Sequence, residues 1–425
     1  MMPSDAHVPF GRADILLPRD CSYEKWAVVA CDQYTSQPEY WQRVEEFVGG
    51  APSALRLILP ESCLDGPNVE TDIVEINNTM THYLREERFR RLPASMIYVE
   101  RTLEGGAVRR GLLGAVDLEA YDYEEDSRAP VRATEGVDLN RLPPRVSLRK
   151  NASLELPHAL LLADDPEDRL MGWLSGEREY MEPLYDFDLM EGGGHLRGWK
   201  LGPEQLAHAE ALLGEILAPE TFRRRHGAEG WPIALLVGDG NHSLATAKEC
   251  YERQKRLTPR EQWENLPARY ALAELVNLHD ESLTFEPVHR VLFGVEPSEV
   301  LAALVRFYPG AHYGDGAGHV LRYVHAGGEG CVTVPAPDAA LEIETLQRFL
   351  NHYLHRMGGR MDYIHGGEVA RRLAGRAGNL AFLLPALDKE ALLPAVWRDG
   401  MLPRKTFSLG RAQDKRFYLE ARKIR

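Results

Sequence analysis

Six small and polar residues between an apolar run and a helical pattern have the types and spacing that phosphate chemistry would use. They read Gly-Asp-Gly-Asn-His-Ser over 238–243. The run before them, Ile-Ala-Leu-Leu-Val over 233–237, is short, apolar throughout and ended by glycine, which predicts a strand buried on both faces. Leu244, Ala247 and Tyr251 then recur at helical spacing. The sequence therefore predicts a strand, a tight polar loop and a helix in succession.

Such a junction is suited to binding an anion. The first N–H groups of a helix have no intrahelical partner and lie at the positive end of the helix dipole, so the backbone of Gly240, Asn241 and Ser243 would hold a phosphate. Asp239 and His242 add titratable groups where an acid or base is useful. The same residues also fit a plain turn, in which Asp239 or Asn241 bonds its own backbone and Ser243 caps the helix. The local pattern leaves both interpretations open.

Several well-known site motifs are missing. No Gly-Lys-Ser/Thr follows the loop and no third glycine completes a dinucleotide fingerprint. No Gly-x-Ser-x-Gly marks a serine hydrolase, and His352 with His355 lacks the glutamate of a His-Glu-x-x-His zinc motif. The acidic run 164–168 is typical of a solvated turn, although a metal-ligand role is conceivable.

Two further sets of residues could serve a phosphate chemistry. Glu135 with Arg132, and Asp32 after the apolar stretch 26–31, supply acids and a cation, although Asp32 could equally cap a turn. A second set consists of cations that could bind phosphate or form structural pairs: His289, Arg290, Arg404 and Lys405.

Composition narrows the class of protein. The chain has 425 residues and a formal net charge of −14, which argues against broad nucleic-acid or anionic-membrane binding. The five cysteines are widely spaced and contain no Cys-x-x-Cys, so we expect reduced thiols and a cytoplasmic protein. No apolar run reaches the length of a membrane helix.

The remaining pattern predicts an α/β (or α+β) protein with a mixed sheet and flanking helices. Residues 268–278 fit a strand or a short helix equally. Strands are expected at 26–31, 55–59 and 380–384, hairpins over 95–118 and 319–334, and helices over 69–91, 203–217, 297–306 and 344–357. We expect a main domain over 1–293 with the loop, a small helix–hairpin–helix subdomain over 294–360, and a segment over 361–425 that packs back on the main domain.

Read together, the motifs resemble a bacterial and archaeal family known as domain of unknown function 1015. Its hallmark resembles the Asp-Gly-Asn-His-Ser of 239–243 followed by Thr246-Ala247. Further pieces lie in family order along nearly the whole chain: residues 26–41 (WAVVACDQYTSQPEYW), 132–136 (RATEG), 287–290 (PVHR), 361–364 (MDYI) and 401–406 (MLPRKT).

The hallmark is also similar to that of free-serine kinases, which have the core fold shared by the ParB partition protein and sulfiredoxin. By that resemblance, Gly240, Asn241 and Ser243 would bind nucleotide phosphates. Asp239 would orient phosphate or hold Mg²⁺, His242 would stabilise the transferring charge, and Glu135 would accept the substrate's proton. The kinases carry arginine where this chain has Ser243, so either Arg290 or Arg404 replaces that cation or transfer does not occur.

Three functions remain open at this point. The first is a small-molecule kinase that uses ATP or ADP, with Mg²⁺, and a small hydroxylated metabolite. The second is a nucleotide-binding switch or scaffold without catalysis, and the third is a metal-dependent phosphoester hydrolase.

Overall fold

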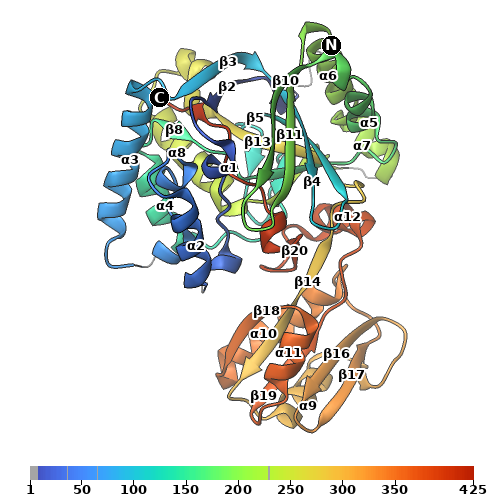
Figure 1. Cartoon of the computed structure of the whole chain (residues 1–425). Helices are drawn as coiled ribbons and strands as arrows, with labels where there is room; N and C mark the ends of the chain where they lie inside the picture. Colours follow the sequence, from blue (N-terminus) through green and yellow to red (C-terminus); the bar gives the residue numbers. More distant parts are fainter. Residues whose placement is uncertain (1–7, 36, 65, 228–229) are drawn as a thin grey trace. The chain divides into compact units, whose positions relative to one another are not determined.

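The computed structural model describes residues 8–35, 37–64, 66–227 and 230–425. The chain divides into two compact units (Figure 1). The first contains Met1–Thr284 together with Gly410–Arg425, and the second contains Phe285–Leu409. Among the described residues, no helix combines the length and apolar composition needed to cross a membrane.

A ten-stranded mixed sheet organises the first unit. Parallel pairing joins β12 to β7, β7 to β6 and β13 to β9, and the other neighbours in the sheet are antiparallel. The strand order is β10 (Glu182–Leu189), β11 (Gly194–Lys200), β4 (Ile97–Thr102), β5 (Val108–Asp117), β13 (Tyr270–Asn277), β9 (Leu160–Ala163), β12 (Leu235–Asp239), β7 (Val131–Ala133) and β6 (Tyr121–Asp122), with β1 (Phe10–Gly11) beside β5.

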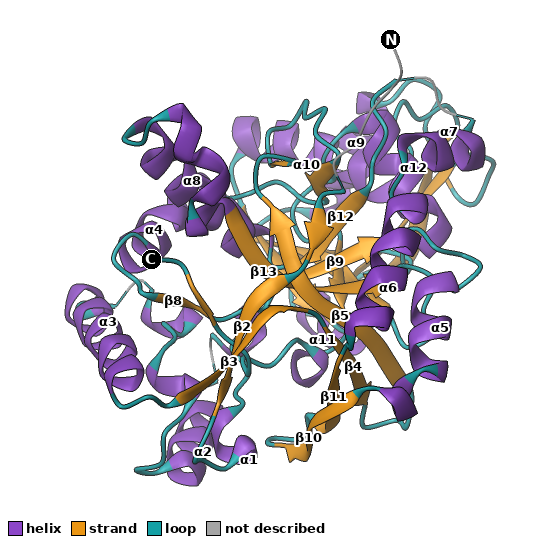
Figure 2. Ribbon diagram, turned by 90° about the horizontal axis from the view of Figure 1, so that it is seen from above, coloured by secondary structure: helices purple, strands orange, loops and turns teal. Residues whose placement is uncertain are grey.

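Apolar cores cover both faces of this sheet, because successive side chains of a strand point to opposite faces. Ile97 and Val99 lie in one core, whereas Tyr98 lies in the other. In Figure 2, α5 and α6 lie on one side of the strands and α1 to α3 on the other. The helices of this unit are α1 (Tyr23–Trp26), α2 (Pro38–Val48), α3 (Val69–Arg85), α4 (Leu142–Arg149), α5 (Arg169–Gly176), α6 (Pro203–Ile216), α7 (Pro219–His226) and α8 (Asn241–Arg256).

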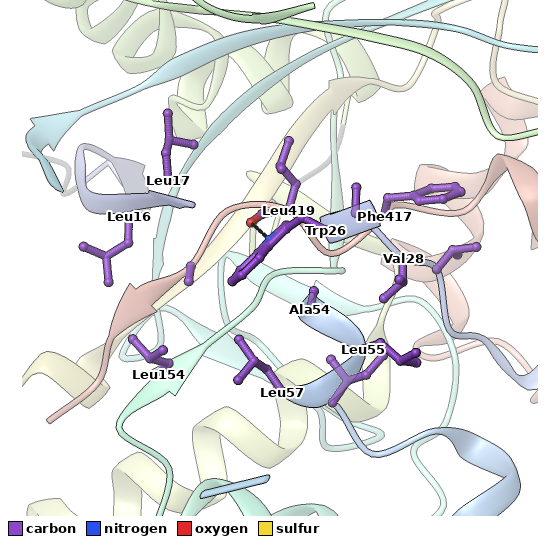
Figure 3. Packing of buried hydrophobic residues seen from close by; sticks show 14 of the residues in the cluster. Leu16, Leu17, Trp26, Val28, Ala54, Leu55, Leu57, Leu154, Phe417 and Leu419 are labelled. Atoms are coloured by element: carbon purple, nitrogen blue, oxygen red, sulfur yellow. Dashed lines mark hydrogen bonds between the residues drawn. The ribbon is translucent and has the colours of Figure 1, made fainter. Parts of the chain in front are cut away.

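The C-terminal segment 410–425 is built into the first unit. Isolated bridges join Leu16 to Ala421 and Val28 to Tyr418, and β21 (Arg422–Lys423) pairs with β8 (Leu154–Glu155). The Trp26 indole N–H donates to the Leu419 carbonyl at 2.9 Å inside the core shown in Figure 3. The segment therefore runs between elements from the beginning and middle of the chain.

The second unit has a seven-stranded sheet of its own, in which β14 pairs with β18, β19 and β20. The predicted helix, hairpin and helix over 294–360 are present, but the unit extends beyond them on both sides because β14 precedes them and β18 to β20 follow. Its elements are β14 (Phe285–Phe293), α9 (Pro297–Phe307), β15 (His312–Tyr313), β16 (His319–His325), β17 (Gly328–Val334), α10 (Glu342–Met357), β18 (Arg360–His365), α11 (Gly367–Ala374), β19 (Asn379–Leu383), α12 (Lys389–Asp399) and β20 (Phe407–Leu409).

Three local predictions were wrong. Residues 26–30 are buried and Cys31 is half-buried, but the stretch forms no strand apart from the single bridge of Val28. Residues 54–56 form a 3-10 turn in place of a strand at 55–59. The helix expected over 69–91 ends at Arg85, because Glu87 adopts a left-handed φ of 55° and β3 (Phe89–Ser95) then pairs with β2 (Ala13–Pro18). The ambiguous stretch 268–278 is a strand, β13.

Candidate functional site

The polar loop joins β12 to α8, as the sequence predicts. Gly240 occupies the N-cap position of α8 with φ 82° and carries no side chain that could accept from the first-turn N–H groups. A Cβ on Gly240 would lie 2.8 Å from the Cα of Ala159, the residue before β9. Any residue with a side chain would therefore have to displace this backbone. Glycine is therefore required here both by the backbone angle and by the close neighbour.

The segment 134–138 is fixed beside this loop. Because β7 and β12 are parallel, with Ala133 opposite Val237, the chain leaves both strands at the same edge of the sheet. The Thr134 hydroxyl donates to the Val237 carbonyl at 2.6 Å, and the Asn241 amide lies 3.4 Å from the Thr134 oxygen. Half-buried Glu135 follows Thr134 directly, so it lies at the same edge of the sheet as the loop.

His242 ties the far end of that segment to α8. Its Nε2 accepts a hydrogen bond from the Asp138 backbone N–H at 3.0 Å. A ring nitrogen that accepts carries no proton, so His242 is a neutral imidazole protonated on Nδ1 in this arrangement. Helix α4 packs on α8 through Leu142 and Val146 against Ala245, which holds the segment from its other side.

Asp239 forms an ion pair that no motif foretold. Its Oδ1 accepts from the Gly240 N–H at 2.9 Å, and its Oδ2 lies 3.1 Å from Nζ of Lys415, whose side chain is only 9% exposed. Burial alone would raise the pKa of Asp239, but the positive charge of Lys415, aided by His158 and the Gly240 N–H, lowers it overall. Asp239 is therefore an ionised carboxylate at neutral pH.

Two more residues border the loop. The Ser243 hydroxyl and Nε2 of His158 are 2.9 Å apart, and the His158 ring lies beside Tyr418 with 5.5 Å between centroids. Burial raises the pKa of the Cys31 thiol to about 11, and the charges of Lys415 and Asp239 both act on it. Asp32 is the next residue in the chain and begins a 3-10 turn, so it belongs to the same neighbourhood.

Arg132 does not reach the loop. Its guanidinium donates to the carbonyls of Ala129 at 2.8 Å and Trp231 at 2.7 Å, residues that precede β7 and β12. Arg132 thus serves the backbone at the opposite ends of these strands from Asp239. Burial lowers its pKa.

The other four predicted cations belong to the second unit. Arg290 is fully buried and donates to the carbonyls of Lys405 at 2.6 Å and Arg404 at 2.8 Å, with the Tyr363 ring 4.8 Å from its guanidinium carbon. The Nδ1 of His289 accepts from the Leu384 N–H at 3.1 Å, and burial lowers the pKa of His289. Within this unit, Arg290 holds the 404–405 backbone in place.

The acidic run at 164–168 has structural partners. Asp164 contacts Nε2 of His279 at 2.7 Å and Nε2 of His226 at 3.0 Å. Burial opposes ionisation of Asp164, but these hydrogen bonds, together with the charge of Arg225, lower its pKa to about 2. In the described part of the chain, no group of three or more His, Cys, Asp or Glu side chains could hold a metal ion.

Sequence reasoning missed Lys415 and His158. Neither stands in a recognisable motif, and the fold brings both to the loop from segments remote in the chain. The signal that existed was indirect. A carboxylate such as Asp239, half-buried at the end of an apolar strand, is stabilised by a positive partner, and the loop itself supplies no lysine or arginine.

A family model described as "Protein of unknown function (DUF1015)" matches residues 16–353. No curated protein is similar enough to match. Among solved structures, a free serine kinase in complex with AMP is 12% identical with a TM-score of 0.38, covering 73% of this chain and 91% of that chain. A mutant free serine kinase in complex with ADP is also 12% identical, with a TM-score of 0.39, and the match covers 73% of this chain and 91% of that chain. SbnI with a C-terminal truncation, from Staphylococcus aureus, is 11% identical with a TM-score of 0.37, covering 70% and 82%.

Proposed function

The chain belongs to the family described as "Protein of unknown function (DUF1015)". From the geometry of its loop we propose a nucleotide-dependent phosphotransferase acting on a small hydroxylated metabolite. One observation carries the proposal: the N-terminus of α8, capped by a glycine without a side chain, lies beside an ionised carboxylate, a buried lysine and an acid-bearing segment. Backbone donors at a helix start are suited to phosphate oxygens. The proposed core is of the ParB and sulfiredoxin kind, as the motif resemblance implies.

Asn241 adds a second reason to expect a ligand. Its Oδ1 is buried and has no hydrogen-bond partner among the residues that the structure describes. Buried polar atoms almost always have partners, so an orphan acceptor beside a candidate site indicates a missing donor. A hydroxyl of a bound nucleotide or substrate would supply it.

The proposed reaction assigns a role to each neighbouring group. A substrate hydroxyl attacks the γ-phosphorus of ATP, the bond to the β–γ bridging oxygen breaks, and ADP leaves. Glu135 accepts the hydroxyl proton, while the α8 N–H groups and His242 stabilise the charge on the transferring group. His242 would donate through Nδ1, since Nε2 is engaged by Asp138.

Mg²⁺ is the cofactor expected with such a nucleotide. The described residues form no metal cage, but Mg²⁺ in kinases is commonly held by one or two carboxylates and the phosphates themselves. Asp239 is ionised and fits that role. When bound, Mg²⁺ would neutralise charge on the phosphates.

Nucleotide binding without transfer is the second candidate. Two features favour it: an uncharged Ser243 stands where the kinases that this motif resembles carry arginine, and the Nε2 of His242 is already used by the backbone of Asp138.

Thermal unfolding with ATP or ADP, with and without Mg²⁺, tests the binding step, because a ligand of the folded state raises the melting temperature. We expect a rise for the wild type and a smaller one for His242→Ala, with exposed His82→Ala as the matched control. Absence of any shift in the wild type contradicts both nucleotide-binding candidates.

Glu135→Gln then separates the two candidates. We expect it to retain ADP binding and to lose phosphorylation of serine-like alcohols, measured as the phosphorylated alcohol formed with ATP or with ADP as the donor. A wild type that binds ADP but phosphorylates no alcohol supports the non-catalytic candidate.

A further inference from the structure

The C-terminal segment brings a cation to the loop that the loop's own sequence lacks. From this geometry we infer that Lys415 is the phosphate-binding cation of the site, in the role that the arginine absent at Ser243 would otherwise have. The inference rests on the proposed function and adds the residue that makes the site selective for phosphate over an uncharged ligand. Lys415 lies outside the stretch 16–353 matched by the family model.

The position of the ammonium supports this role. Lys415 Nζ lies 3.1 Å from Oδ2 of Asp239, and Asp239 precedes the N-cap Gly240. The ammonium therefore contacts the residue just before the N-cap of α8, near the end of the helix where the dipole is positive. Because a lysine carries three N–H donors, it can contact Asp239 and a phosphate oxygen together.

The backbone that carries Lys415 is held firmly. Its carbonyl accepts from the buried Arg101 guanidinium at 2.5 Å. The next residue, Arg416, is buried between Glu274 at 2.8 Å and Glu420 at 2.7 Å. A cation whose main chain is fixed in this way loses little conformational entropy when it binds an oxyanion, which favours affinity.

The neighbouring groups leave the charge available. Burial raises the pKa of the Cys31 thiol to about 11, so this thiol is uncharged at neutral pH and does not compete for the ammonium. The ion pair of Lys415 is with Asp239. The Oδ1 of Asp239 is already bonded to Gly240. A phosphate with nearly two negative charges competes strongly with one shared carboxylate oxygen for the ammonium.

Calorimetric titration of ADP and of adenosine, both without Mg²⁺, tests the inference. We expect Lys415→Gln to weaken ADP binding by about tenfold or more, the usual scale for a lost charge-assisted hydrogen bond, and to leave adenosine binding unchanged. Lys415→Arg should restore most of the ADP affinity. Lys423→Gln, an exposed lysine of the same segment, is the matched control and should bind both ligands as the wild type does.

Each other outcome has a definite meaning. Equal ADP affinity in the wild type and Lys415→Gln overturns the inference and leaves the proposed function intact. An equal loss for ADP and adenosine makes Lys415 merely structural and also overturns it. A wild type that binds no nucleotide removes the proposed function, and the inference with it.

A second variant covers the case in which Lys415→Gln does not fold because half-buried Asp239 loses its ion-pair partner. Asp239→Asn with Lys415→Gln removes both charges together, and its reference is Asp239→Asn alone. The inference requires the double variant to bind ADP more weakly than that reference, and equal binding overturns it.

Discussion

At Gly240 the loop depends on a residue that has no side chain. The residue has to satisfy two demands at once, a left-handed backbone and contact with the Ala159 main chain. Either demand alone is met at other positions of the chain. Gly106 has nearly the same φ, 83°, and nothing within 4 Å of where a Cβ would lie. This pair allows the two costs to be measured separately.

Gly106→Ala should lower the free energy of unfolding by about 1–2 kcal/mol, the cost of a left-handed alanine. Gly240→Ala should lose more than that, because its Cβ also displaces backbone atoms, and it should weaken ADP binding. Urea unfolding of both variants beside the wild type measures the difference. Equal losses at the two positions would contradict the contact with Ala159.

At the scale of elements, the segment 410–425 does more than close the chain. It places Arg416 between Glu274 and Glu420, whose side chains are each at most 4% exposed, and Glu420 also accepts from the Tyr185 hydroxyl at 2.6 Å. Burying such charges is costly, and they are tolerated only while every member is paired. The segment therefore adds stability only when it is fully docked.

Arg416→Met should cost about 3–5 kcal/mol of unfolding free energy, since it removes the cation paired with Glu420 and leaves buried Glu274 with the more distant Arg109, at 3.9 Å. Lys423→Met, on an exposed side chain nearby, should change little. Denaturant unfolding at neutral pH measures both, and a small loss for Arg416→Met would show that water reaches the two glutamates.

The sequence predicts local elements of this unit well and their partners poorly. The strand, loop and helix at 233–256 follow from periodicity and glycine placement, which are local properties. The apolar stretch 26–31 is buried as expected over residues 26–30 but is not a strand, because an apolar run indicates burial and not the type of secondary structure. Lys415 and His158 could not be predicted to meet the loop, because their proximity depends on how remote segments pack together.

At the scale of the whole molecule, the second unit is an insertion in the first. The chain leaves the first unit after Thr284 and returns to it at Gly410. The Gly410 N–H donates to the Thr284 carbonyl at 2.9 Å. The two ends of the insertion are thus adjacent. The residues proposed for catalysis and phosphate binding, Glu135, Asp239, His242 and Lys415, all belong to the first unit.

Replacing 285–409 by a short glycine linker should therefore leave a folded first unit with a single cooperative thermal transition. Its affinity for ADP should equal that of the intact chain if the first unit holds the complete site. Circular dichroism on heating and calorimetric titration provide the two measurements. An unfolded product would show that the first unit needs the second for stability.

The insertion of the second unit between Thr284 and Gly410 also sets an order of events during synthesis. Residues 285–409 leave the ribosome as one continuous stretch, so the second unit can fold as soon as it emerges. The first unit, although it begins earlier, has to wait for 410–425 before Trp26, Glu274 and Asp239 find their partners. Domains generally fold in the order in which they are made. In this chain the domain that starts first is completed last, and its nascent form exposes unpaired acids and apolar surface until the final segment docks.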